Sequence, residues 1–227
     1  MGIAADVMKL AVDRTVAIES DAVHIEGMLG IPENAQGVVL FAHGSGSGRF
    51  SPRNQFVAQV LREGGIGTLL VDLLDQAESE DRRKVFDIAL LADRLLSATK
   101  WLRANEETCK LAIGYFGAST GAAAALRAVA EGKQDIRAIV SRGGRPDLAI
   151  HYLPNITTPT LLIVGGDDYP VIQLNKEAQA ALAGITELVI IPGASHLFEE
   201  PGALEKVAKL AQEWFIKYLP CDPTPAI

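Results

Sequence analysis

The sequence predicts an α/β fold: a mostly parallel twisted sheet with an N-terminal antiparallel hairpin, helices on both faces and little or no cap. Short apolar runs alternate with stretches of helical periodicity from residue 37 to residue 218. Strands that alternate with helices in this way favour a parallel sheet. Before them, residues 11–18 and 23–31 alternate between apolar and polar positions, which is typical of a hairpin with one solvated face.

Length, composition and charge indicate one soluble domain. The chain has 227 residues, 48% hydrophobic and 22% charged, so we expect a single domain over 1–227 with poorly ordered ends at 1–9 and 220–227. Its net charge of -7 argues against a nucleic-acid partner. No signal-peptide pattern and no run of about 20 apolar residues is present. Cys109 and Cys221 lack metal-ligand spacing, so we expect reduced thiols, no metal and a cytoplasmic location.

The individual strands and helices are predicted from apolar runs and from the residues that cap or break helices. Strands are expected at 37–42, 68–72, 111–116, 136–140, 160–164 and 187–191. Helices are expected at 51–63, 83–105, 120–131, 147–153, 170–182 and 201–218, and the charged residues 76–82 are expected to form a loop. Large insertions that cover the site usually occur within the segment 141–159. Because this segment is short, we expect at most one small helix over the site.

The residues from Leu111 to Ala125 organise the chain. An apolar strand leads into Gly117-Ala118-Ser119-Thr120-Gly121, and an alanine-rich helix follows. This strand, G-x-S-x-G and helix order is the context of a nucleophile elbow. The turn is tight, so Gly117 and Gly121 supply the space that it needs. The alternative is a glycine-rich turn with a capping serine.

Two further strand ends supply partners for a serine nucleophile. Asp168 follows the strand at 160–164, and His196 follows the strand at 187–191. A serine hydroxyl needs a base to activate it, and the base needs a carboxylate to orient it. We therefore predict the triad Ser119, Asp168 and His196, in the chain order of the α/β hydrolases. Asp167 competes with Asp168 for the acidic role, and we favour Asp168.

The loop after the strand at 37–42 reads His43-Gly44-Ser45-Gly46-Ser47-Gly48. An oxyanion hole needs two N–H groups aimed at one oxygen. We assign these to the backbone N–H groups of Thr120 and Ser45, with Gly44 or Gly46 as alternatives to Ser45. A phosphate-binding loop is the rival interpretation, but the Lys-Ser/Thr ending of a Walker A motif is missing.

Several other residues lie in loops at the same edge of the predicted sheet. Arg49, Arg142 and Arg145 are candidates for binding a substrate carboxylate or phosphate, although ordinary surface arginines are an equal alternative. Tyr169 and His43 are further candidates for substrate contacts. For His43 a structural role in the loop is favoured over a role as a second base.

The motifs HGSGSG, GASTG, VGGDD and ASHLFEEPGAL together resemble the α/β-hydrolase superfamily, and the short chain is similar to its dienelactone-hydrolase-like members. The resemblance spans Val38 to Tyr218. It implies acyl-transfer chemistry without a cofactor. Dienelactone hydrolases proper carry cysteine where Ser119 stands, which favours a general ester or thioester substrate. Some relatives of this type occur beside phosphoribosyltransferase domains.

The expected function is that of a serine hydrolase acting on a small-molecule ester, thioester or lactone through an acyl-enzyme intermediate. An acyltransferase would use the same triad with an acceptor other than water. A non-catalytic binding module on the same fold is the alternative from a different class. A homodimer formed through an exposed sheet edge is compatible with all three.

Overall fold

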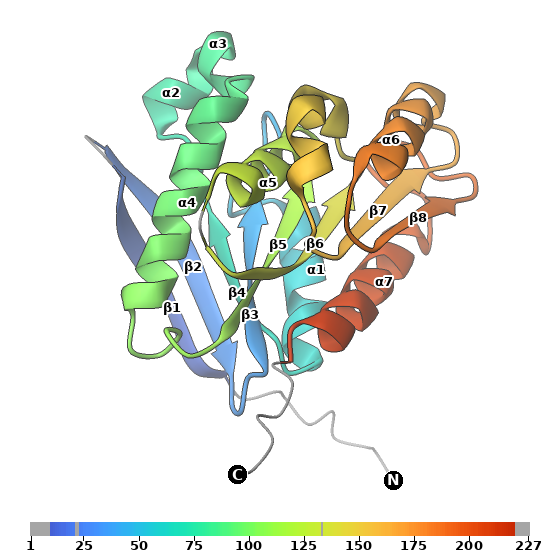
Figure 1. Cartoon of the computed structure of the whole chain (residues 1–227). Coiled ribbons are helices and arrows are strands. Elements are labelled where there is room, and N and C mark those ends of the chain that lie inside the picture. The colour runs from blue at the N-terminus through green and yellow to red at the C-terminus, as the bar shows by residue number, and fades with distance from the viewer. Residues whose placement is uncertain (1–9, 21–22, 133, 221–227) are drawn as a thin grey trace, which may run out of the picture.

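The computed structural model describes residues 10–20, 23–132 and 134–220, and its centre is an eight-stranded sheet (Figure 1). The strand order is β1-β2-β4-β3-β5-β6-β7-β8. β1 pairs antiparallel with β2 and β2 with β4, whereas all later pairs are parallel. The predicted hairpin and parallel sheet are therefore confirmed. The strands are β1 (Leu10–Ser20), β2 (Val23–Pro32), β3 (Gly37–Ala42), β4 (Gly67–Val71), β5 (Ala112–Ala118), β6 (Ile136–Arg142), β7 (Thr160–Gly165) and β8 (Thr186–Ile191).

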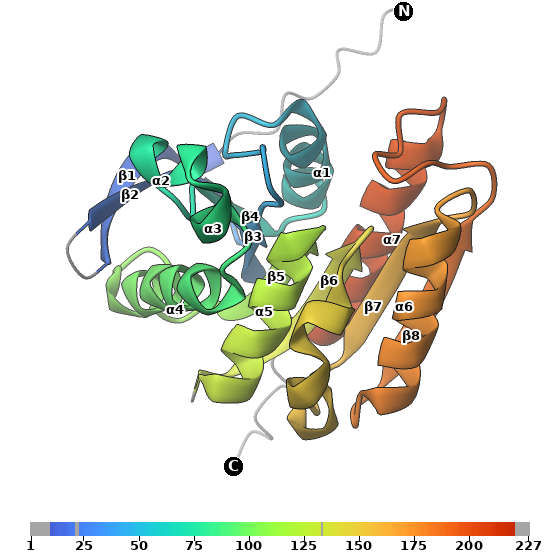
Figure 2. The same ribbon diagram turned by 90° about the horizontal axis from the view of Figure 1, so that it is seen from above.

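Helices cover both faces of the sheet, as Figure 2 shows from above. One face carries α1 (Pro52–Glu63) and α7 (Ala203–Tyr218). The other carries α4 (Ile88–Ala104), α5 (Thr120–Glu131), the 3-10 helix η1 (Pro146–Asn155) and α6 (Tyr169–Ala181). Side chains alternate along a strand, so β3 supplies both cores. Leu40 packs on the α4 and α5 side, and Phe41 packs on the α1 and α7 side.

The topology fixes where a site can form. The connection from β3 through α1 leads to β4 on one side of β3, whereas β5 lies on its other side. The strand order thus reverses between β3 and β5. Ligands of open α/β sheets bind beyond the carboxyl ends of the strands at such a point. The loop after β3 and the turn after β5, which hold Gly44 and Ser119, meet there.

Two predicted boundaries are wrong. Residues 76–82, expected to be a loop, contain α2 (Gln76–Glu80) and the start of α3 (Arg82–Val85). The expected helix 83–105 begins at Ile88, because the Asp87 carboxylate accepts a hydrogen bond from the N–H of Leu90 and caps α4. At α2, Asp75 and Glu78 form a capping box. Side-chain caps, rather than apolar periodicity, therefore define these short helices.

The segment between β6 and β7 holds one short helix, η1, so the prediction of little or no cap is confirmed. No helix of the described residues is long and apolar enough to cross a membrane, and no cluster in this same part of the chain could hold a metal ion. The predictions for Cys221 and for residues 1–9 and 221–227 lie outside the described residues.

Candidate active site

Ser119 occupies the turn between β5 and α5 in a backbone conformation that is rare for a residue with a side chain, φ 51° and ψ -121°. The crowding around the turn explains the glycines. A Cβ on Gly117 would lie 2.4 Å from the Cα of Ala122, and one on Gly121 would lie 2.1 Å from the carbonyl oxygen of Ala42. The helix can approach the strands this closely only without those side chains.

Asp168 and His196 are joined by a hydrogen bond. The Nδ1 of His196 lies 2.6 Å from Oδ2 of Asp168. The Asp168 side chain is 13% exposed and that of His196 is 38% exposed. Because Nδ1 is bonded to the carboxylate, Nε2 is the nitrogen left to exchange a proton with a nucleophile or substrate. Asp167, the other candidate for the acidic role, is exposed.

Ser119 and His196 border the same short segment of backbone. The Ser119 N–H donates to the carbonyl of Arg142 at 3.2 Å. A Cβ on the next residue, Gly143, would lie 3.5 Å from Cε1 of His196. The described residues show no hydrogen bond between the Ser119 hydroxyl and the His196 ring. Such bonds are often long before substrate binds.

The loop after β3 lies directly against Ser119. A Cβ on Gly44 would sit 2.8 Å from the Cβ of Ser119. Gly44 accepts a hydrogen bond from the Ser47 N–H at 3.2 Å, so Ser45 and Gly46 lie at the tip of a turn, and Ser45 is exposed. Thr120 begins α5, where backbone N–H groups lack intrahelical acceptors.

A cleft of about 800 Å³ extends from this loop toward β2 and α2. Its walls include Gly44, Ser45, Glu26, Asp72 and Asp75. Gly44 lines the cleft and also lies against Ser119, whereas Ser119, Asp168 and His196 are not among the residues that line it. The walls also include apolar side chains, among them Ile25, Phe50 and Leu74, so the lining is mixed.

Comparison with known proteins identifies the family of this chain. The family model described as the dienelactone hydrolase family matches residues 25–219. This chain belongs to that family. Among solved structures, a dienelactone hydrolase from Anabaena variabilis is 56% identical, with a TM-score of 0.89 over 92% of this chain and 98% of that chain. Est1E from Butyrivibrio proteoclasticus is 16% identical, with a TM-score of 0.76 over 89% of this chain and 98% of that one, and shows the shared fold alone.

Two Mycobacterium tuberculosis proteins that carry the provisional name phosphoribosyl transferase are 54% identical over 214 residues. The match covers 94% of this chain and 48% of each relative. The chain therefore spans about half the length of the curated relatives that it matches.

The ring of His43 is held in place by two hydrogen bonds to backbone groups. Its Nδ1 donates to the Gly44 carbonyl at 3.0 Å, and its Nε2 accepts from the Leu73 N–H at 3.0 Å. Both ring nitrogens are thus engaged with backbone, and the ring is neutral in this arrangement. Burial lowers the pKa of His43, with hydrogen bonding to Gly44 and the charge of Asp72 opposing the shift.

The candidate arginines have different surroundings. Arg49 is held by the carboxylates of Asp72 and Glu26. Arg145 pairs with Asp147 through two hydrogen bonds of 2.8 Å. Arg142 is buried, and the described residues offer its side chain neither an ion pair nor a hydrogen bond.

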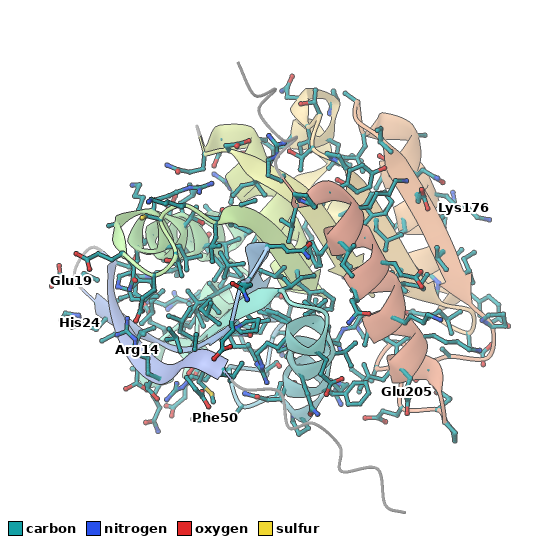
Figure 3. The ribbon with its side chains drawn as sticks, turned by 90° about the horizontal axis from the view of Figure 1, so that it is seen from below. Arg14, Glu19, His24, Phe50, Lys176 and Glu205 are labelled. Atoms are coloured by element: carbon teal, nitrogen blue, oxygen red, sulfur yellow. The ribbon has the colours of Figure 1, made fainter. Side chains whose placement is uncertain are left out.

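The aromatic candidate, Tyr169, is 72% exposed at the start of α6. Figure 3 shows His24 at the outer edge of the hairpin. It pairs there with Glu19 and is exposed.

Two acidic residues that shape the loops were not predicted from the sequence. Asp72, after β4, accepts a hydrogen bond from the Arg49 N–H at 2.6 Å in addition to its ion pair with the Arg49 side chain. Glu200 accepts a hydrogen bond from the Ser195 N–H at 3.0 Å, which closes the loop around His196. Hydrogen bonds from Ser195 lower the pKa of Glu200. The position of Asp72 at a strand end could have identified it from the sequence, whereas nothing in the sequence around Glu200 indicates its role.

Proposed function

We propose that this protein is a serine hydrolase that cleaves small carboxylic esters, thioesters or lactones through an acyl-enzyme intermediate. The observation that carries the proposal is the strained turn at Ser119, which borders the same backbone segment, Arg142 and Gly143, as a histidine bonded to Asp168. Strain of this kind is characteristic of a nucleophile elbow, where it projects the hydroxyl away from the sheet.

In the proposed reaction, Nε2 of His196 takes the proton of the Ser119 hydroxyl while its oxygen attacks the ester carbonyl. Asp168 holds the Nδ1–H and stabilises the imidazolium that forms. The backbone N–H groups of Thr120 and Ser45 bind the oxyanion. His196 then returns the proton to the departing alcohol or thiol. In the second half, His196 activates water, which attacks the acyl-enzyme and releases the acid. The reaction as written uses no cofactor.

The segment between β6 and β7 holds a single short helix, η1, and such a small cover supports small acyl groups. A strong preference for long-chain esters over acetate or butyrate would contradict this part of the proposal. The mycobacterial relatives are named as whole proteins, and this chain matches 48% of each.

The test is steady-state hydrolysis of p-nitrophenyl acetate and butyrate by the wild type and by Ser119→Ala. Turnover in the wild type and its loss in a folded variant support the proposal. Equal rates in both proteins would overturn it. Adding methanol or a thiol and analysing the products separates the acyltransferase alternative, for which the acyl group would appear on the added acceptor in preference to water.

A further inference from the structure

Arg142 occupies an unusual position for a charged side chain. It is the last residue of β6 and is 8% exposed. Alternation along the strand places it on the same face as Val140, toward α1 and α7. Its carbonyl accepts the Ser119 N–H, and the following residue, Gly143, lies under the His196 ring. Arg142 therefore belongs to the backbone segment that contacts both Ser119 and His196.

Among the described residues, no anion compensates the charge of Arg142. Its buried Nη1 has no hydrogen-bond partner, and the described residues provide no carboxylate for an ion pair. Burial and the nearby positive charge of Arg53 lower the pKa of Arg142 to about 10, so the group is still charged at neutral pH. An unpaired buried cation is strongly unfavourable, and proteins rarely retain one without a ligand or a partner.

Arg94 shows how the same chain handles a buried arginine that has a structural role. It is 4% exposed, and its Nη2 lies 3.3 Å from the Glu78 carboxylate. Its Nη1 donates to the carbonyl of Ser20. Arg142 is buried to a similar degree but has neither kind of partner. Structural stabilisation therefore accounts for Arg94 and does not account for Arg142.

We propose that Arg142, assisted by Arg53, binds an anionic oxygen group of the substrate, a carboxylate or a phosphate. Arg53 stands in the first turn of α1, bonds to Glu199 through Nη1 at 3.1 Å, and has a buried Nε without a partner. A planar guanidinium binds either oxyanion through paired N–H groups. This inference rests on the proposed function and narrows it to esters that carry a negative charge near the cleaved bond.

The test compares mono-p-nitrophenyl adipate, which carries a free carboxylate, with neutral p-nitrophenyl heptanoate of similar length. The variants are Arg142→Met and Arg142→Lys, and Arg14→Gln is the control because it removes a distant positive charge on β1. We expect Arg142→Met to lower kcat/KM for the adipate ester by about 10- to 100-fold and to leave the neutral ester within about threefold. Arg142→Lys should restore part of the difference.

The melting temperature gives a second readout. If Arg142 is kept for binding, Arg142→Met removes an unpaired buried charge and should raise Tm, whereas a structural arginine would give a lower Tm. Free adipate and inorganic phosphate, tested as inhibitors of the neutral reaction, distinguish a carboxylate site from a phosphate site. We expect one of them to inhibit the wild type and Arg14→Gln more strongly than Arg142→Met.

The outcomes separate this inference from the proposed function. Ser119-dependent hydrolysis with no preference for the anionic ester, and no effect of Arg142→Met, overturns the inference and leaves the hydrolase proposal standing. Absence of any ester hydrolysis overturns the proposed function. In that case calorimetric titration with adipate and phosphate decides the site: binding lost in Arg142→Met supports it, and equal or absent binding in both proteins refutes it.

Discussion

Gly44→Ala places a methyl group between the loop after β3 and Ser119. The new Cβ would lie 2.8 Å from the Ser119 Cβ and 2.9 Å from the Ala118 carbonyl oxygen. Carbon atoms in contact sit about 3.5–4.0 Å apart, so the loop must move by roughly 0.7 Å or more. Neither obstacle is the flexible end of a side chain, because one is the first carbon of Ser119 and the other is backbone. The displacement therefore falls on the loop that we assign to the oxyanion hole.

Moving a catalytic group by about 1 Å can cost on the order of 100-fold in rate, and removal of one oxyanion donor costs about 10²–10³. We accordingly expect kcat/KM of Gly44→Ala for p-nitrophenyl butyrate to fall by about 100-fold. Gly46→Ala is the control in the same loop, since its Cβ would meet nothing within 4 Å. Its φ of +69° predicts a stability loss of about 1–2 kcal/mol and less than about tenfold in rate. Gly44→Ala with wild-type activity would refute this account of the loop.

Three further predictions concern the triad and two buried ionisable groups. Asp168→Asn should lower kcat for ester hydrolysis by about 10³–10⁴-fold because the histidine loses the acceptor of its Nδ1–H, whereas Asp167→Asn should change it by less than about threefold. The lowered pKa of His43 means that, below about pH 6.5, the unfolded chain binds a proton that the folded protein does not bind. Urea denaturation should therefore show stability falling from pH 7.5 to pH 5, by up to about 1.4 kcal/mol per pH unit, and less steeply in His43→Gln. Glu78→Ala leaves Arg94 buried without its carboxylate and should cost about 3 kcal/mol in urea denaturation.

Each of these three predictions would be contradicted by a specific result. Equal losses in Asp167→Asn and Asp168→Asn would mean that the hydrogen bond to His196 is not the catalytic one. An unchanged pH slope in His43→Gln would mean that His43 takes up its proton in the folded protein. A loss below about 1 kcal/mol in Glu78→Ala would show that Arg94 finds water or another acceptor.

The features that could be predicted from the sequence are those fixed by local pattern. The continuous apolar run of β3 and the Gly117 to Gly121 turn define a buried strand and a tight strand-to-helix connection. The convergence of Asp168 and His196 followed from their positions after neighbouring parallel strands. What sequence could not distinguish by pattern alone was Asp167 from Asp168, since both follow β7 and the choice depends on which side chain faces the loop after β8.

The remaining differences arise from contacts between distant residues. Arg49 reads as a free loop arginine, but β4 brings Asp72 to it and β2 brings Glu26. Arg142 reads the same way, yet it faces the interior, and no acid among the described residues pairs with it. Only the partners that other strands supply separate a paired arginine from an unpaired one.

The most direct test of the account is labelling with a p-nitrophenyl alkylphosphonate, followed by mass spectrometry and peptide mapping. The account predicts release of p-nitrophenol in proportion to protein, one phosphonyl group on Ser119, and no label in Ser119→Ala. A folded wild-type protein that takes up no label, or takes it up at another residue, would contradict the assignment of Ser119 as the nucleophile. The binding-module alternative would then explain the fold better than a hydrolase does.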